Sequence, residues 1–396
     1  MKANVGTMVR AAKCKTIDIT TPITLEAYVE FIVRDKDGRI AQYRRKKAES
    51  FVRQFIDLLY VKMAGLINLA GKYYPVLDYT NTSRNVYSGI YSFATLDGTI
   101  TDVTKGIIIG TGPNAVTISD YKLQTPIAHA TMNYSAVTFG APTDDGTTSQ
   151  FRITRDFSNV SGGSVTVEEC ALYGYDQITG TYMIARDVTG GIAVPNGQTL
   201  TLNYQIQATI ANYLVRGFIQ HLYSLMSGIA MSMLDIGNAS RLLNFSRSYG
   251  ALGIYGTGGL CTRLTPFTSM STGDATYTGD DLGLVVGSGT AAVASTDYKL
   301  NTKIAHGLTS GTQLLHAGTE VDIPVISAPT ANFKIRRYFY NGSGAPVTVK
   351  EAGIYVPYAV LATTVHLFLI ARKLTGDVAV LDTELLKVEW TFQVST

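Results

Sequence analysis

The sequence predicts a mainly β protein made of two tandem homologous antiparallel β-sandwich (jelly-roll-like) domains, with one helix per repeat. Three observations lead to this prediction. The chain of 396 residues is long enough for two cores. Most of it consists of short β-branched or aromatic stretches between Gly, Asn and Ser turns, without the strand–helix rhythm of parallel sheets. Finally, long blocks of sequence occur twice in the same order.

Five blocks are repeated. Val52–Gly65 recurs as Val215–Gly228 at an offset of 163, and Phe151–Tyr173 recurs as Phe333–Tyr355 at an offset of 182. The other pairs are Gly106–Gly112 with Gly283–Gly289, Asp120–His129 with Asp297–His306, and Ile184–Gly190 with Ile370–Gly376. Because the order is kept and the offset only grows, we infer a tandem duplication with insertions of about 14, 5 and 4 residues in the second copy.

The repeats also suggest domain boundaries. We expect an N-terminal arm at 1–22, a first repeat at 23–210 with a helix at about 48–64, and a second repeat at 211–396 with a helix at about 212–228. No Pro/Gly linker separates the repeats, which predicts two domains in a fixed relation. The arm has no counterpart in the second copy, so we expect it to be disordered unless a neighbour holds it.

Each repeat opens with an apolar helical pattern. The apolar positions are Phe51, Phe55, Leu58, Leu59 and Met63 in the first copy, and Leu214, Phe218, Leu222, Leu225 and Met226 in the second. Further apolar residues widen the stripe in the first copy, so we expect this helix to be covered on more than one side.

Strand patterns surround each helix. Before the first helix, apolar and polar residues alternate on both sides of Asp37-Gly38, which predicts a β-hairpin. Near the end of the first repeat, Leu202, Tyr204 and Ile206 alternate with polar residues, which predicts a strand with one face in a core.

The composition narrows the class of protein. Hydrophobic residues make up 46% and charged residues only 16%, below the roughly 25% of an average soluble domain. These values exclude a disordered tail and a coiled coil. A net charge of +3 gives no global field that would favour nucleic acid as a partner.

The cysteines and the apolar stretches of the sequence indicate the cellular compartment of the protein and whether it needs a cofactor. Cys14, Cys170 and Cys261 are too few and too scattered for a disulfide framework or a zinc site, and we expect no cofactor. The first residues contain no signal-peptide pattern. The longest apolar stretch, Tyr213–Leu234, is interrupted by Arg216 and His221, so we expect synthesis in the cytoplasm and no membrane insertion.

His129 and His306 occupy the same place in the repeated DYKLxTxIAH block, after Asp120 and Asp297. A catalytic interpretation would pair each histidine with its aspartate and add a nucleophile. No activated Ser or Cys lies nearby in the sequence, and the block carries apolar packing residues. We therefore favour a structural role for both pairs.

Gly110 and Gly112, matched by Gly287 and Gly289, end an apolar strand and superficially suggest a phosphate-binding loop. Such a loop needs a third glycine and a helix that starts at once. Neither follows here, so turn or bulge glycines are the better interpretation.

Arg44, Arg45, Lys46 and Lys47 form the densest run of charge. One interpretation is a contact patch for an acidic protein or nucleic acid. The second copy lacks the run, so the unit folds without it, and a solvated hairpin arm is the simpler explanation.

Two further matched pairs, Arg155 with Arg337 and Glu169 with Glu351, suggest a cross-strand Arg–Glu ion pair that is kept in both copies. A glycosidase-like acid/base pair would need two facing carboxylates, which the spacing does not supply.

Two other features carry less information. Asn81, Asn159, Asn238 and Asn341 lie in N-x-S/T sequons, which have no meaning without secretion. The Gly-rich, aromatic insertion at 247–264 is either a loop that reaches a neighbouring subunit or a longer surface turn.

Taken together, the repeated motifs resemble a pattern found in structural (virion) proteins of tailed bacteriophages and related prokaryotic viruses. The residues that carry it are Gly110, Gly112, Asp120, Tyr121, Leu123, Arg155, Phe157, Asn159, Gly162, Glu169, Tyr173, Pro195 and Gly197. The second copy keeps Gly287, Gly289, Asp297, Tyr298, Leu300, Arg337, Phe339, Asn341, Gly344, Glu351 and Tyr355. The second copy departs at Leu381, Asp382 and Thr383, which replace the P-x-G turn.

The resemblance implies a non-enzymatic virion component of the tail, baseplate or fibre region, present in the virion and assembled in the host cytoplasm. Its partners would be copies of itself and other particle proteins. The alternatives are a head-associated accessory or decoration protein, and an adhesin module that binds a host-surface glycan through Tyr-rich loops. An enzyme would need converging, perturbed titratable groups, and the sequence nominates none.

Overall fold

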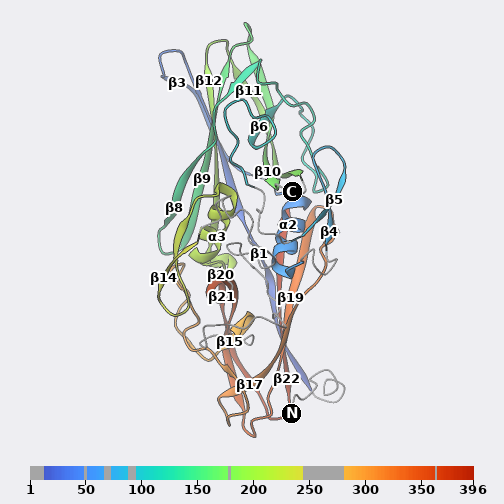
Figure 1. Ribbon diagram of the computed structural model, residues 1–396, viewed down its shortest axis with the longest axis vertical. Coiled ribbons are helices and arrows are strands. Elements are labelled where there is room, and N and C mark those ends of the chain that lie inside the picture. Colours follow the sequence, from blue (N-terminus) through green and yellow to red (C-terminus); the bar gives the residue numbers. More distant parts are fainter. Residues whose placement is uncertain are drawn as a thin grey trace.

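Strands dominate the computed structural model, which describes residues 13–48, 51–66, 73–87, 95–176, 180–243, 281–361 and 364–396. Two α-helices lie among them. The prediction of a mainly β fold with helices is confirmed. The Gly-rich insertion at 247–264 lies outside the described residues. The molecule is elongated: most of the described residues of 25–212, the first half, lie toward one end, and most of those of 213–396, the second half, lie toward the other (Figure 1).

The first half contains a six-stranded antiparallel sheet, here the first large sheet. Its order is β3-β2-β12-β9-β7, and β8 also pairs with β9. The strands are β2 (Glu26–Arg34), β3 (Ile40–Lys47), β7 (Met132–Tyr134), β8 (Thr138–Asp144), β9 (Thr148–Asn159) and β12 (Thr199–Thr209). Alternation sets the faces, since Val29, Phe31 and Val33 of β2 are fully buried while their neighbours face outward. The predicted hairpin is present, with Gly38 at φ 80° in its turn.

A smaller three-stranded sheet covers the inner face of the first large sheet. Its order is β11-β10-β6, with β6 (Gly106–Gly110), β10 (Val165–Asp176) and β11 (Gly180–Val194). The Tyr204 hydroxyl of β12 donates to Asp187 of β11 at 3.0 Å. The first half is therefore a two-layer arrangement of sheets.

The second half has the same two layers. Its large sheet, the second large sheet, has the order β1-β22-β19-β17-β16, with β18 beside β19. The strands are β1 (Cys14–Thr24), β16 (Ala305–His306), β17 (Gln313–Val321), β18 (Val325–Ser327), β19 (Thr330–Tyr340) and β22 (Leu385–Ser395). The covering sheet has the order β15-β20-β21, with β15 (Gly283–Gly287), β20 (Val347–Leu361) and β21 (Thr364–Val380).

Two strand pairs depart from the predicted antiparallel pattern. β1 runs parallel to β22, and β16 runs parallel to β17. Because Leu25 alone separates β1 from β2, these two strands cannot fold back on each other as a hairpin. The chain therefore runs on as one extended ribbon from the second large sheet into the first (Figure 1).

This ribbon gives the described part of the expected N-terminal arm its neighbour, while residues 1–12 of that arm lie outside the described residues. Residues Cys14–Thr24 are held along β22 of the same chain, with Ile17 and Ile19 in the core. The arm therefore ties the second half to the first.

The two helices, α2 (Arg53–Ala64) and α3 (Arg216–Ser227), begin several residues later than the sequence suggested. The helices begin later because Phe51 and Leu214 form β-bridges with β11 and β21, which keep the chain before each helix extended. Each helix ends at a left-handed glycine, Gly65 at φ 61° and Gly228 at φ 69°.

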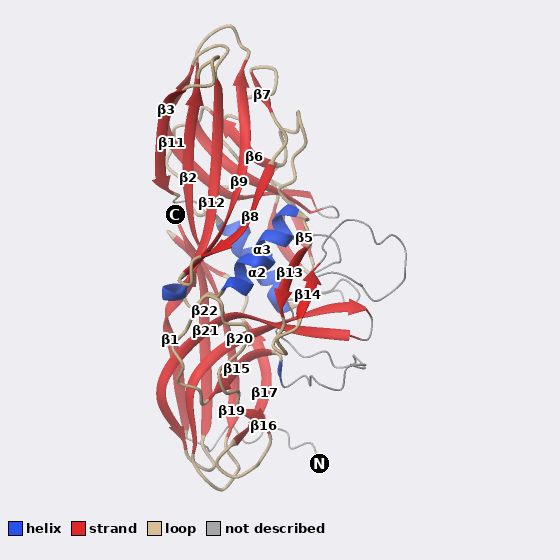
Figure 2. Ribbon diagram, turned by 90° about the vertical axis from the view of Figure 1, so that its left-hand side faces the viewer, coloured by secondary structure: helices blue, strands red, loops and turns tan. Residues whose placement is uncertain are grey.

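The helices lie between the two halves, and each packs on the large sheet of the opposite half (Figure 2). Tyr60 of α2 contacts Phe333 of β19, with ring centroids 6.0 Å apart. Tyr223 of α3 contacts Phe151 of β9 at 5.5 Å. One continuous cluster of buried apolar residues consequently runs through both halves.

Two short hairpins complete the described structure. They are β4 (Tyr74–Leu77) with β5 (Ser83–Val86), and β13 (Met231–Leu234) with β14 (Ser240–Leu243). Each packs beside the helix that precedes it.

Candidate functional site

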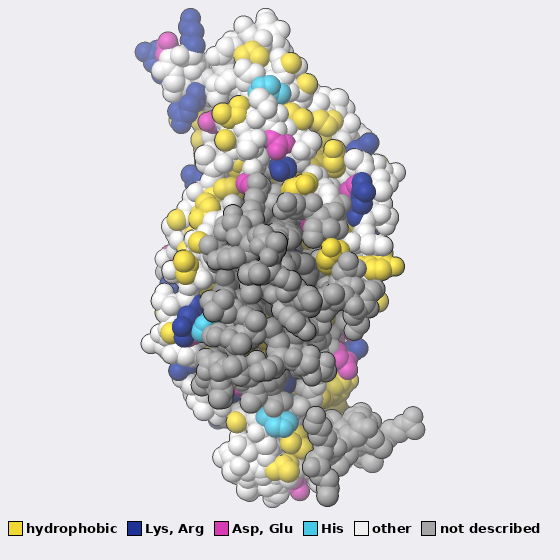
Figure 3. Space-filling view, in the orientation of Figure 1, with side chains coloured by type: hydrophobic (Ala, Val, Ile, Leu, Met, Phe, Trp, Pro, Cys, Tyr) yellow, Lys and Arg dark blue, Asp and Glu magenta, His cyan; other side chains and the backbone are white. Residues whose placement is uncertain are grey.

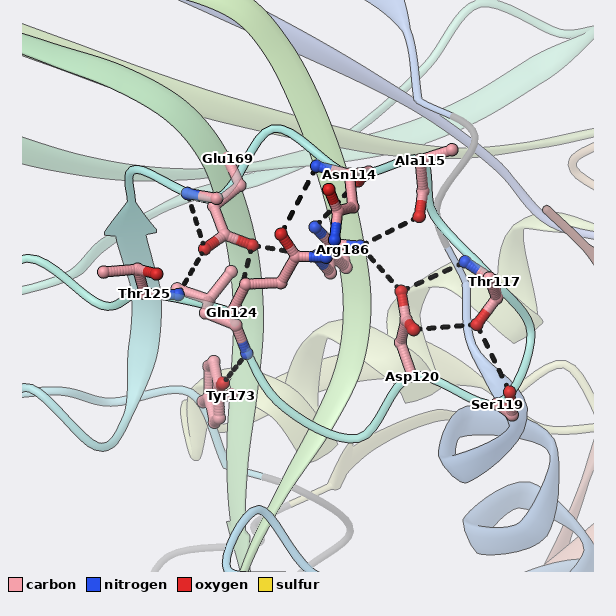
Figure 4. Close-up of polar contacts among 12 residues, drawn as sticks. Asn114, Ala115, Thr117, Ser119, Asp120, Gln124, Thr125, Glu169, Tyr173 and Arg186 are labelled. Atoms are coloured by element: carbon pink, nitrogen blue, oxygen red, sulfur yellow. Dashed lines mark hydrogen bonds and ion pairs between the residues drawn. The ribbon is translucent and has the colours of Figure 1, made fainter.

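The Glu169 carboxylate is the centre of the first matched polar network (Figure 4). It lies on β10 and is completely buried. Its oxygens accept backbone N–H groups from Gly112 at 3.1 Å, Gln124 at 3.2 Å and Thr125 at 2.9 Å. They also accept Arg186 Nε at 2.9 Å. The buried charge is thus paired and hydrogen-bonded on all sides, as a buried carboxylate must be.

Arg186 of β11 connects this carboxylate to Asp120. Its Nη1 donates to Asp120 Oδ2 at 2.7 Å, and its Nη2 donates to the Asn114 carbonyl at 2.9 Å. Burial alone would lower the pKa of the guanidinium, but the hydrogen bonds to Asp120 and Glu169 outweigh it and hold that pKa above its ordinary value. Asp120 in turn accepts the backbone N–H of Thr117 at 3.0 Å. The network therefore fastens the loop after β6 to two strands (Figure 4).

The glycines of the GTG motif are explained by this carboxylate. A Cβ on Gly110 would lie 2.5 Å from Glu169 Oε1 and 2.6 Å from the Thr125 carbonyl, and a Cβ on Gly112 would lie 2.7 Å from the same Oε1. The backbone N–H of Gly112, which a phosphate loop would offer to its ligand, is already taken by Glu169. The loop carries its own anion, so its glycines allow close approach of a side chain rather than of a nucleotide.

The second half repeats the network residue by residue. Glu351 accepts backbone N–H groups from Gly289 at 3.2 Å, Asn301 at 3.1 Å and Thr302 at 2.8 Å, and accepts Arg372 Nε at 2.9 Å. Arg372 Nη1 donates to Asp297 at 2.6 Å. Gly287 stands in the position of Gly110, with Glu351 Oε1 2.6 Å from the place of its missing Cβ.

Two pairs of matched tyrosines are associated with the same loops. The hydroxyls of Tyr173 and Tyr355 accept the backbone N–H of Leu123 at 2.7 Å and of Leu300 at 2.8 Å. Tyr121 and Tyr298 are partly exposed instead, each beside the lysine that follows it. These two tyrosines, like Asp120 and Asp297, are only partly buried.

The predicted Arg155–Glu169 and Arg337–Glu351 pairs are wrong, since both glutamates bind other arginines. Arg155 of β9 instead donates to five backbone carbonyls, those of Thr99, Asp102, Lys105, Ile107 and Ser135, at 2.6 to 3.0 Å. Burial lowers its pKa to about 10. Arg337 likewise donates to the carbonyls of Ala317, Leu282 and Leu284. A planar guanidinium with five donors suits this role, because strand and loop carbonyls converge on it.

The histidines are separated from their aspartates. His129 Nδ1 accepts the backbone N–H of Tyr134 at 3.0 Å, and His306 Nδ1 accepts that of His316 at 3.0 Å. Asp120 and Asp297 are directed to the arginines instead. The residues of the DYKLxTxIAH block thus form scaffold contacts rather than a catalytic pair.

The basic run lies on β3, at the edge of the first large sheet. Arg44 and Lys46 point over the small sheet and donate to the carbonyls of Thr189 at 2.6 Å and Val188 at 2.7 Å. Arg45 and Lys47 point to the other face and pair with glutamates on β2 at 3.6 and 3.0 Å. Lys and Arg side chains gather at the end of the molecule where this hairpin projects (Figure 3). All four cations therefore have partners within the chain.

The sequons at Asn159 and Asn341 hold buried side chains. Asn159 Nδ2 donates to the carbonyls of Gly163 and Val194, and Asn341 Nδ2 donates to those of Ala345 and Val380. Both side chains are fully buried. A glycan could not be attached to either without breaking these turns.

A third matched motif was missed in the sequence. Asp78 accepts two backbone N–H groups of its turn and pairs with Arg84 at 2.7 Å. Asp235 does the same with Arg241 at 2.8 Å. The available signal is the spacing D-x-x-N-x-S-R, which occurs at 78–84 and again at 235–241.

The described residues show no membrane-spanning helix and no metal-binding cluster. Neither helix in the described ranges has the length and apolarity needed to cross a membrane. Across the same residues, no three His, Cys, Asp or Glu side chains form a group that could hold a metal ion. Comparisons with protein-family models, with curated proteins and with solved structures found no match.

Proposed function

We propose that this chain is a non-enzymatic virion structural protein of a tailed bacteriophage or related prokaryotic virus, placed in the tail, baseplate or fibre region. The proposal rests on the structural role of the residues that the two halves share. Asp120, Arg155, Glu169 and Arg186, with their counterparts in the second half, hold loops to sheets. Residues kept for shape alone are what an assembly subunit requires.

We further propose that the two halves are homologous jelly-roll-like sandwiches that arose by tandem duplication. In support, equivalent residues make equivalent bonds. Glu169 and Glu351 each accept three loop N–H groups and one arginine. Arg155 and Arg337 each donate to the carbonyls of the first strand of the covering sheet. Unrelated sequences would not reproduce both sets of contacts at matched positions.

Assembly would use the surfaces that the scaffold leaves available. Exposed apolar side chains lie at the projecting hairpin, Ile40 and Tyr43, and near the opposite end, Leu308 and Leu381. Interfaces between subunits bury such apolar residues within a polar rim. Copies of this chain and neighbouring particle proteins are accordingly the expected partners.

The duplication also suggests a symmetry. Three chains with two similar units each could fill six quasi-equivalent places in a ring. Mass photometry and native mass spectrometry of the purified protein test this. The expected result is a discrete species of three 42.7 kDa chains. A stable monomer at micromolar concentration would count against the ring and against assembly through self-contact.

The position in a particle needs a separate experiment. Labelling with an antibody fragment and imaging by electron microscopy should show the chain in the tail, baseplate or fibre. Labelled heads would favour the decoration protein instead. Saturable binding on a glycan array by the isolated protein would favour the adhesin.

A further inference from the structure

The contacts between the two halves are reciprocal. Tyr60 of α2 lies against Phe333 in the second large sheet, and Tyr223 of α3 lies against Phe151 in the first. The tyrosines correspond at the offset of 163, and the phenylalanines at the offset of 182. One contact therefore occurs twice, with the roles of the two halves exchanged.

The starts of the helices, by contrast, remain attached to their own half. Val52 N–H donates to the Ile184 carbonyl at 3.2 Å, and Val215 N–H donates to the Ile370 carbonyl at 3.1 Å. Phe51 and Leu214 form the matching bridges to β11 and β21. Each helix is thus anchored on its own small sheet while its side chains pack on the opposite large sheet.

Two covalent links join the halves: Leu25, between β1 of the second large sheet and β2 of the first, and the short connection from β12 to α3. β12 ends at Thr209, one turn of 3-10 helix covers Ile210–Asn212, and α3 begins at Arg216. Ala211 in this turn is exposed. The connection contributes little to the core, which is formed by the exchanged helices and the sheets that they cover.

We infer that the chain is a covalently joined pseudodimer. The surface between its halves is a two-fold, self-complementary interface, on which each half gives a helix to the large sheet of the other. The partner that fits either large sheet is a second copy of the same module. Such mutual exchange is the geometry of a domain-swapped homodimer, in which residue i contacts j and j contacts i.

The extent of the shared core supports an obligate interface. Phe333 of the second large sheet stacks on Phe392 at 5.3 Å beneath Tyr60, and both phenylalanines are buried. Removing one half would expose this apolar face, so neither half should persist alone. The inference rests on the proposed duplication, but it requires no role in a particle.

The test uses the full chain with a protease recognition sequence inserted after Ala211. After cleavage, the two fragments should remain one particle with the mass of the parent on size exclusion with light scattering. Its melting temperature should rise with protein concentration, because unfolding now separates two chains. The uncut protein with the same insertion is the control, and its melting temperature should not depend on concentration.

Substitutions then identify the interface. In the cut protein, Tyr60→Ala and Tyr223→Ala should each weaken association of the fragments by about tenfold or more, equivalent to at least ~1.4 kcal/mol. Tyr43→Ala on the exposed hairpin should leave it unchanged. Separation into two folded fragments would overturn the inference, since the halves would be independent domains. Irreversible unfolding after the cut would also overturn it, because the interface would not suffice without the connection.

Discussion

In the first half, Glu169 accepts three loop N–H groups and Arg186, and in the second half Glu351 accepts three loop N–H groups and Arg372. The distances agree to within about a tenth of an ångström. These contacts are the same in both halves although the halves differ in most of their other residues.

The outer faces of the two large sheets are different. In the first half, Glu30 of β2 pairs with Arg45 and Arg152 at 3.6 and 3.7 Å, beside the hydrogen bond from Thr154 to Asn203 at 2.6 Å. In the second half, Glu389 accepts Lys334 at 2.7 Å and Lys387 at 2.6 Å. The comparison teaches that the halves share what fastens loops to sheets and differ in what a partner would meet.

The largest effect is expected at the shared carboxylates. Glu169→Ala and Glu351→Ala each remove one of the two carboxylates that pair with a buried arginine, and leave three N–H groups without that acceptor. The free energy of unfolding should fall by about 3–5 kcal/mol in each case, as it does when one member of a buried pair is removed. Urea denaturation monitored by circular dichroism measures both losses. A loss in one half only would mean that the two networks are not equivalent.

The exchanged tyrosines should give the next largest effect. Tyr60→Ala and Tyr223→Ala create cavities next to buried phenylalanines, and each should cost about 2–4 kcal/mol. Hydrogen exchange locates the damage: Tyr60→Ala should deprotect β19 in the second half, and Tyr223→Ala should deprotect β9 in the first. If each variant deprotects only its own half, the exchange of helices is not what holds the halves together.

The two helices also differ in their buried titratable groups, and this difference predicts opposite responses to pH. Burial raises the pKa of Asp57 in α2 to about 6, and Arg53 offsets this only in part. Burial lowers the pKa of His221 in α3 to about 4, against its hydrogen bond to the Gly217 carbonyl. Asp57 therefore costs stability once it ionises, and His221 costs stability once the unfolded chain binds a proton.

The direction in which each group changes the stability with pH follows from these two pKa values. The stability from Asp57 is fully present below pH 3.8 and is lost as the pH rises to about 6. The stability from His221 is present above pH 6.5 and is lost as the pH falls to about 4. Relative to the parent, Asp57→Asn should lose stability on acidification from pH 6.5 to 4, and His221→Leu should gain it, each by about 2–3 kcal/mol. Urea titrations across this range measure the slopes, and parallel curves for both variants would contradict the assignment.

The periodicity of the sequence was enough to predict a β-rich chain with two helices, because apolar spacing reports which face of an element is buried. It could not tell which sheet would cover that face. Tyr60 and Tyr223 look the same whether their helices pack on their own half or on the other. Tertiary packing decides which large sheet each helix covers, and the local sequence pattern does not encode this.

The polar networks show the same limit. Glu169 was recognised as a matched residue, yet its partner Arg186 was passed over within the repeated IAR block. An arginine inside an apolar strand, kept in both copies, was the signal that could have identified it, since a buried guanidinium requires acceptors. The parallel pairing of β1 with β22 had no such signal, because an edge strand pairs with whatever backbone is unpaired nearby.

The smallest effect concerns the charge run that the second half lacks. Arg45→Gln together with Lys47→Gln removes two exposed ion pairs to glutamates on β2, so the free energy of unfolding should change by less than about 1 kcal/mol. Arg44→Gln together with Lys46→Gln is the matched comparison, because these side chains bond the Val188 and Thr189 carbonyls and cover the edge of a sheet. Thermal unfolding of both double variants shows which of them loses more stability. A larger loss for the outward pair would show that β3 depends on its surface charges rather than on the bonds that cross to β11.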